Sequence, residues 1–149
     1  MTQRLDYNNA SPAGMKALGA VYGYLAQSGL PGQLLDLVNL RASQLNGCAF
    51  CIDMHSRDLL KSGLAVEKLV LVPVWHEAGA LFTPREQAAL RWTETVTLVA
   101  QTHIPDEEYQ AARAEFSEKE LTDLTIAIGL INAYNRIGVG FRPTPAAVK

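Results

Sequence analysis

Signals that start helices recur along this chain, and they constrain its fold more than any other feature of the sequence. Residues 83–86 (Thr-Pro-Arg-Glu) and 117–120 (Ser-Glu-Lys-Glu) are capping boxes, in which a hydroxyl and a glutamate satisfy the first free amides of a helix. Pro12, Pro31 and Pro105 are each placed to open another helix, because proline lacks only an N–H that a first turn leaves unused. Apolar residues at helical spacing follow these starts, so the pattern predicts a chain built from helices.

Strand signals are weak throughout. No region combines period-two alternation with hairpin turns. Residues 66–75 fit a helix or a strand, and Pro73 weakens either interpretation. The segment from Leu121 to about Arg136 is apolar on more than one face, which predicts a buried helix, after which Gly138 and Gly140 are expected to loosen the chain. We therefore predict an all-α fold with six or seven helices.

Length and composition set further bounds. The 149 residues fit a single domain over 1–149, with residues 143–149 as a flexible tail. Hydrophobic residues at 48% and charged residues at 19% argue against disorder, and a net charge of −2 argues against a dedicated nucleic-acid binder. Apolar runs fall far short of the roughly 18 residues that span a bilayer, and the N-terminus lacks the apolar core of a secretory signal. We expect a cytoplasmic protein with no nucleic-acid or membrane partner.

The two cysteines, Cys48 and Cys51, are the most informative residues for function. In a reducing compartment such a close pair is more often redox-active or metal-binding than structural. Asn46 or Gly47 is placed to cap a new helix, which puts Cys48 in its first turn. At about 100° per residue, Cys51 then lies about 60° and His55 about 20° from Cys48 around the helix. All three side chains are therefore predicted to project from one side.

This placement predicts thiol chemistry. The free amides and dipole of a first turn favour a thiolate, so the pKa of a cysteine there falls below its usual value of about 8.5. His55, one turn after Cys51, is placed to accept the thiol proton. Cys48 is placed to close a disulfide with Cys51 after oxidation. The segment thus supplies an attacking sulfur, a base and a resolving sulfur.

Other interpretations of these residues remain open at this point. Free cysteines are often small buried hydrophobic residues. Cys48, Cys51 and His55 also offer three metal ligands, but a structural zinc site needs four, and His76 and His103 are isolated along the chain. A thioredoxin fold would place the pair after a strand, whereas the preceding segment reads as a helix. We expect no bound cofactor, because no glycine-rich dinucleotide or phosphate loop is present.

Residues 35–55, with Asn-Gly-Cys-Ala-Phe-Cys-Ile-Asp-Met-His at their end, closely resemble the alkyl hydroperoxidase D core of the carboxymuconolactone decarboxylase superfamily. Residues 71–77, the helix from Thr83 and residues 123–136 resemble the same group. The resemblance implies an all-helical protein that assembles as a trimer or hexamer. The decarboxylase branch generally lacks the cysteine pair, so the resemblance disfavours lyase chemistry.

The resemblance also implies roles for four residues. Cys51 would attack the peroxide, Cys48 would resolve the oxidised form, and His55 would belong to a proton relay. The family relay uses a glutamate twelve residues before the first cysteine, and here that position is Asp36, which is one methylene shorter. The shorter side chain predicts either a bridging water between Asp36 and His55 or a weakened relay. The alternative is that Asp36 is an ordinary surface acid of an amphipathic helix.

The function predicted from these observations is a thiol-dependent hydroperoxide reductase, with an external dithiol or a redox protein as electron donor. The alternatives are a thiol–disulfide oxidoreductase or redox sensor, and a metal-binding or ligand-binding oligomer. Trp75, His76 and Glu77 could line a pocket or close a helix end. Trp92 is predicted to lie in the core and His103 in a loop.

Overall fold

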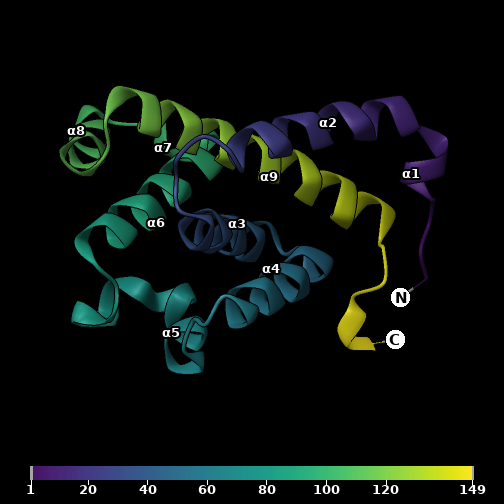
Figure 1. Cartoon of the computed structure of the whole chain (residues 1–149), viewed down its shortest axis with the longest axis horizontal. Helices are drawn as coiled ribbons and strands as arrows, with labels where there is room; N and C mark the ends of the chain where they lie inside the picture. Colours follow the sequence, from purple (N-terminus) through teal and green to yellow (C-terminus); the bar gives the residue numbers. More distant parts are fainter. Residues whose placement is uncertain (1, 149) are drawn as a thin grey trace.

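The computed structural model describes residues 2–148 and contains helices but no strand in that range (Figure 1). The α-helices are α1 (Tyr7–Ala10), α2 (Pro12–Leu25), α3 (Gly32–Asn46), α4 (Ala49–Lys61), α5 (Val66–Leu71), α6 (Pro84–Thr97), α7 (Val99–Thr102), α8 (Asp106–Glu115) and α9 (Glu118–Phe141). Short 3-10 helices are η1 (Val72–Glu77), η2 (Gly79–Leu81) and η3 (Ala146–Val148). The predicted all-α fold is confirmed; α1 and α7 are single turns of four residues, which the sequence pattern does not reveal.

Both predicted capping boxes form. The Thr83 hydroxyl accepts from the Glu86 N–H at the start of α6, and the Glu86 carboxylate accepts from the Thr83 N–H at 2.7 Å. Ser117 and Glu120 make the reciprocal pair at the start of α9. These bonds satisfy amide groups that have no partner within the helix.

The ambiguous segment after residue 65 is helical, but its second half is not a regular α-helix. Residues 66–71 form α5, and 3-10 geometry follows from Val72, with Val74 at a non-helical φ of −126°. Pro73 has no N–H to donate to the preceding turn, so the α-helical ladder cannot continue through it.

Helix α9 is longer than predicted. The expectation that the chain loosens after about Arg136 is wrong, because α9 continues through Gly138 and Gly140 to Phe141. A Cβ atom on Gly138 would lie 2.7 Å from the Sγ atom of Cys48. Glycine at this position permits a close approach of α9 to the cysteines and does not end the helix.

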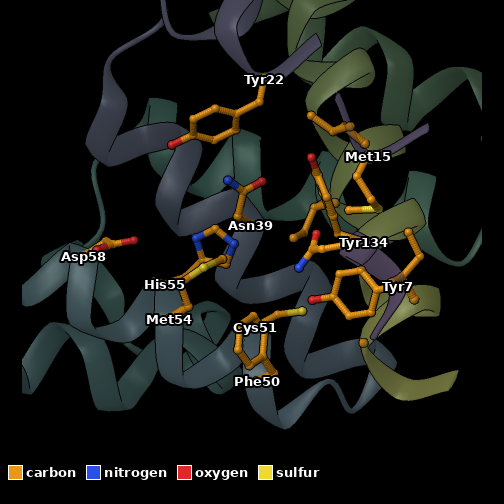
Figure 2. Close-up of a pocket in the computed structure, with 15 residues that line it drawn as sticks. Tyr7, Met15, Tyr22, Asn39, Phe50, Cys51, Met54, His55, Asp58 and Tyr134 are labelled. Atoms are coloured by element: carbon orange, nitrogen blue, oxygen red, sulfur yellow. The ribbon is translucent and has the colours of Figure 1, made fainter. Parts of the chain in front are cut away.

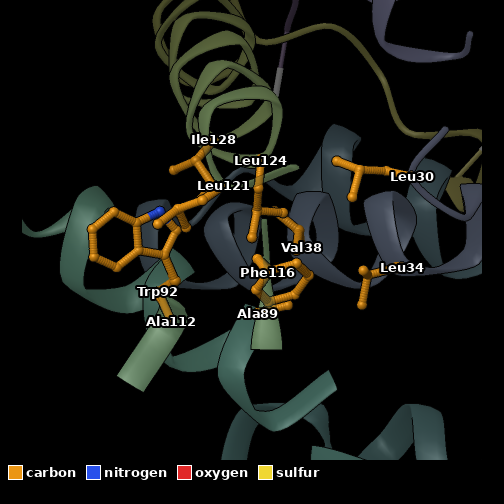
Figure 3. Packing of buried hydrophobic residues seen from close by; sticks show 10 residues of the cluster. All are labelled: Leu30, Leu34, Val38, Ala89, Trp92, Ala112, Phe116, Leu121, Leu124 and Ile128. Atoms are coloured by element: carbon orange, nitrogen blue, oxygen red, sulfur yellow. The ribbon is translucent and has the colours of Figure 1, made fainter. Parts of the chain in front are cut away.

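Helix α3 is the centre of the fold and packs against α4, α6 and α9 (Figure 1). One core cluster joins α3, α6 and α9 through Val38, Trp92, Leu124 and Ile128, which places Trp92 in the core as predicted (Figure 3). A second cluster around Phe82, Leu37 and Leu59 joins α3 to α4 and the segment before α6. The site described below lies where α3, α4 and α9 meet.

The two ends of the described chain lie near the end of α9 (Figure 1). The Arg4 N–H donates to the Phe141 carbonyl at 2.9 Å, and the Tyr7 ring stacks on the Phe141 ring. Beyond α9, the Ala147 N–H donates to the Asp53 carboxylate of α4 at 3.1 Å. Lys149, the last residue of the expected flexible tail, lies outside the described residues, and the flexibility of the tail stays a prediction. No helix in residues 2–148 is long and apolar enough to cross a membrane.

Candidate active site

The α3–α4 junction positions both cysteines. Gly47 ends α3 in the left-handed conformation, with φ 68°, and Cys48 is the N-cap of α4. The prediction that Cys48 lies in the first turn is therefore off by one residue, because Gly47 closes the preceding helix and Cys48 itself caps the next. The Cys48 Sγ atom accepts from the Cys51 N–H at 3.3 Å, and Cys51 lies in the first turn. The amide end of α4 therefore faces the sulfur atoms.

Cys48 and Cys51 form a disulfide, with their Cα atoms 5.4 Å apart. The predicted closure of the pair therefore requires no unwinding of the backbone. Both residues are buried, with 1% of Cys48 and 3% of Cys51 exposed. They differ in access, however, because Cys51 lines a cavity of about 400 Å³ while Cys48 is absent from its wall. Gly138 of α9 packs against the Cys48 sulfur.

His55 lies on α4 one turn after Cys51 and lines the same cavity (Figure 2). Its Nδ1 atom is 3.3 Å from the Asp36 Oδ1 atom of α3, within hydrogen-bond distance. The shorter carboxylate thus reaches the imidazole directly. The Nε2 atom of His55 is buried and has no hydrogen-bond partner in the described part of the chain.

The cavity wall is largely apolar, with a few polar groups. Its residues come from α1, α2, α3, α4 and α9 and are Tyr7, Asn8, Met15, Tyr22, Asn39, Phe50, Cys51, Met54, His55, Asp58, Leu130, Ile131, Tyr134, Ile137 and Gly138. Figure 2 shows the Tyr7 hydroxyl directed toward the Cys51 sulfur, and burial and the nearby Asp6 charge raise the pKa of Tyr7. Apart from Cys51 and His55, none of these wall residues is predicted from the sequence to be functional.

Asp58 is a further acidic group at the site. One ligand atom from each of Asp36, His55 and Asp58 lies within 4.8 Å of the others, so these three residues could hold a cation through carboxylate and imidazole atoms. The only sequence signal for Asp58 is its position three residues after His55, which places both on one face of α4. The alternative ligand set of Cys48, Cys51 and His55 is not assembled here, because the sulfur atoms bond to each other.

A network of amides supports the end of α3 beside Cys48. Asn46 donates to the side-chain oxygens of Asn132 and Asn135 on α9, at 3.0 and 2.9 Å. Asn135 donates to the Ser43 hydroxyl, and the Ser43 carbonyl accepts from the Cys48 N–H. This network fixes the position of the α3–α4 junction against α9.

The structure places the other candidate residues outside the cavity. The Trp75 indole N–H donates to Glu94 at 2.7 Å, and Arg41 pairs with the same carboxylate. His76 is exposed and lies near Glu77. His103 follows α7 in the left-handed conformation, consistent with the predicted loop.

Fold and site together define an all-helical protein with a cysteine pair that closes at a helix start beside a buried histidine. The chain belongs to the carboxymuconolactone decarboxylase family, which matches residues 12–95. The resemblance found in the sequence is therefore confirmed at the level of the family.

Similar proteins extend this comparison. The uncharacterized protein YdfG of Bacillus subtilis (strain 168) is 37% identical over 139 residues, covering 93% of this chain and 94% of that protein. A crystal structure is known for a similar protein of unknown function from Agrobacterium tumefaciens, which is described as a candidate antioxidant defence protein AhpD. It has a TM-score of 0.93 and 42% identity to this chain, and the match covers 97% of this chain and 98% of that chain. The debrominase Bmp8 has a TM-score of 0.82 over 93% of this chain and 74% of that chain, and its 16% identity shows the shared fold alone.

Proposed function

We propose that the protein is a thiol-dependent hydroperoxide reductase. The observation that carries this proposal is the cysteine pair itself, which closes as a disulfide while only Cys51 lines the cavity. A substrate in the cavity can meet the Cys51 sulfur, and the Cys48 sulfur is within bonding reach behind it. This asymmetry matches an attacking and a resolving thiol. The description of the Agrobacterium protein as a candidate AhpD supports the same chemistry.

The proposed reaction has three steps, namely attack on the peroxide, disulfide formation and reduction of the disulfide. The Cys51 thiolate attacks the terminal oxygen of the hydroperoxide, so an S–O bond forms, the O–O bond breaks, and the leaving alkoxide takes a proton from protonated His55. The Cys48 thiol then attacks the sulfur of the Cys51 sulfenic acid, which forms the disulfide and releases water. An external dithiol reduces this disulfide by exchange and is itself oxidised to a disulfide.

In the proposed proton relay, His55 accepts the Cys51 proton and Asp36 stabilises the resulting imidazolium. The 3.3 Å separation of the Asp36 Oδ1 and His55 Nδ1 atoms supports this role, since a carboxylate there accepts from Nδ1–H and fixes the orientation of the ring. With Nδ1 directed to Asp36, the buried and unpartnered Nε2 atom is the one left to exchange protons.

The proposed electron donor is a small dithiol. A donor must bring its thiolate into line with one sulfur of the disulfide, and both sulfurs are buried. The cavity of about 400 Å³ admits a small molecule to Cys51 more readily than the surface of a redox protein. The same burial disfavours a general oxidoreductase that acts on disulfides of folded proteins. A cytoplasmic location is part of this proposal, and so is a trimeric or hexameric assembly of the kind that the family resemblance implies.

A peroxide-consumption assay tests the proposal. Wild-type protein with a dithiol reductant is expected to consume cumene hydroperoxide catalytically, and Cys51→Ser is expected to lose this activity entirely. Cys48→Ser is expected to complete one attack and stop as a sulfenic acid that a dimedone probe traps. Wild-type protein without peroxide consumption, or Cys51→Ser protein that retains it, would show that the proposal is wrong. In that case rapid disulfide exchange without peroxide would favour the oxidoreductase alternative.

A further inference from the structure

Asn39 stands out among the cavity residues because its carboxamide has no hydrogen-bond partner in the described part of the chain. It lies on α3, three residues after Asp36, and only 8% of the residue is exposed. Its backbone carbonyl accepts from the Ser43 hydroxyl, but its carboxamide makes no hydrogen bond with any other residue in 2–148. Figure 2 shows this carboxamide in the cavity that Cys51 and His55 also line.

The carboxamide of Asn39 is reached from the cavity and is not sealed in the core. In residues 2–148 the sealed side-chain polar atoms without a partner are Gln44 Oε1 and His55 Nε2, and the Asn39 atoms are not among them. Because polar groups of a protein are usually hydrogen-bonded, a carboxamide that no protein group uses is left to water or to a bound molecule. The other asparagines near the cysteines, Asn46, Asn132 and Asn135, all bond to protein groups. The free carboxamide of Asn39 is therefore available to a bound molecule.

Asn39 adds a polar group to the cavity that Cys51 also lines. Asn39 and His55 share this cavity with apolar walls that include Met15, Phe50 and Ile131. A hydroperoxide with an apolar body matches this division, since its two oxygen atoms need polar partners and its carbon atoms need apolar walls.

We propose that Asn39 binds the hydroperoxide directly, by donating a hydrogen bond from its Nδ2–H to the oxygen that leaves. This inference rests on the proposed function. As the Cys51 thiolate bonds to the terminal oxygen and the O–O bond breaks, negative charge develops on the leaving oxygen. A donor already in place stabilises that charge without reorganisation, which accelerates the attack on peroxide. The leaving alkoxide then receives its proton from His55, so Asn39 itself exchanges no proton.

This assignment separates Asn39 from the groups that activate the thiol. His55 and Asp36 determine how much Cys51 thiolate is present, whereas Asn39 acts only when an O–O bond is breaking. Removal of its donor should therefore slow the reaction with hydroperoxide but not reactions of the same thiolate with other electrophiles. A purely structural role would slow both.

The experiment uses Asn39→Leu and Asn39→Gln in a Cys48→Ser background, so that Cys51 is the only thiol. Reduced protein is mixed with cumene hydroperoxide, and the second-order rate of thiol loss is measured. Cys51 alkylation by iodoacetamide is measured from pH 5 to 9 on the same samples. Gln33→Leu is the matched control, because Gln33 is an amide on α3 that bonds to Ser62 outside the cavity.

Asn39→Leu is expected to lower the hydroperoxide rate by about tenfold to a hundredfold, the value of one hydrogen bond to a charged group. The alkylation rate and its pH profile should match the parent, and Asn39→Gln should recover part of the lost rate through its retained amide. Gln33→Leu should leave both rates unchanged.

Two outcomes would overturn the role of Asn39 but leave the proposed function standing. One is an Asn39→Leu rate within twofold of the parent. The other is an equal fall in alkylation, which would show that Asn39 acts through the thiolate or the fold. Parent protein that is alkylated at Cys51 but does not react with hydroperoxide would overturn the proposed function, and this inference with it.

Discussion

At the scale of single residues, Gly138 determines how closely α9 approaches the cysteine pair. A Cβ atom there would lie 2.7 Å from the Cys48 sulfur and 3.4 Å from the Cys51 sulfur. The first distance is shorter than carbon–sulfur contact allows, so a methyl group must displace the sulfur or the helix. Both partners are held in packed elements, which makes either displacement costly.

Gly138→Ala is therefore expected to destabilise the protein by about 1–3 kcal/mol, the usual cost of overpacking. Urea unfolding of the oxidised protein measures this loss. Gly129→Ala is the matched control on the same helix, since a Cβ atom there meets nothing within 4 Å. The control should gain up to about 1 kcal/mol from the higher helix propensity of alanine. Equal stability changes in the two variants would contradict the close packing of Gly138.

Asp36 is the second residue whose role depends on a single contact. Replacing its carboxylate by an amide keeps the shape but removes the negative charge beside the His55 ring. Asp36→Asn is expected to slow peroxide turnover at neutral pH by roughly tenfold to a hundredfold and to change the pH–rate profile. Asp53→Asn, which alters an acid paired with Arg57 outside the cavity, is the control and should retain the parent rate. A pH–rate profile of Asp36→Asn that matches wild type would exclude Asp36 from the relay.

At the scale of the element, the start of α9 joins capping to an ion pair. The Glu120 carboxylate accepts from the Ser117 N–H at 2.9 Å and from the Arg85 guanidinium at 2.6 Å. These two bonds lower the pKa of Glu120 to about 2, and the bond from the Ser117 N–H has the larger effect. Because the folded-state pKa lies below the unfolded value, Glu120 stabilises the protein above about pH 4.5, and this contribution is lost as the pH falls toward 2.

Glu120→Gln is accordingly expected to lower the free energy of unfolding at pH 7 by about 0.5–1 kcal/mol, after allowance for solvent screening of a partly exposed pair. The difference from wild type should shrink as the pH falls from 4.5 toward 2. Urea unfolding at pH 7, 4 and 3 measures the trend. Glu118→Gln, in the same first turn but largely exposed, should show a smaller effect at pH 7. A difference that stays constant across these pH values would show that the Glu120 charge has no such role.

Elements also show where sequence patterns succeed and fail. The capping boxes of α6 and α9 are predictable because both partners lie within four residues, so local chemistry is sufficient. The continuation of α9 through Gly138 is not predictable in this way. The glycine there makes room for the Cys48 sulfur, 90 residues away along the chain, and the same glycine in an isolated helix would weaken that helix.

At the scale of the whole molecule, the cavity is built from parts of the chain that are far apart in sequence. Tyr7 and Met15 come from the N-terminal helices, Cys51 and His55 from α4, and Ile137 from the end of α9. The N-terminal segment reaches this position because Arg4 and Tyr7 attach it to Phe141 (Figure 1). Removal of the N-terminal helices would therefore alter the cavity wall.

The amino-acid sequence by itself was sufficient for the all-α fold, the two capping-box helix starts and the cysteine–histidine face of α4, because each depends on residues within one or two helical turns. The contact between Asp36 and His55, the difference in access between Cys51 and Cys48, and the free carboxamide of Asn39 were decided only by the tertiary structure. They depend on how α3, α4 and α9 cross, and that crossing results from side-chain packing across the whole core.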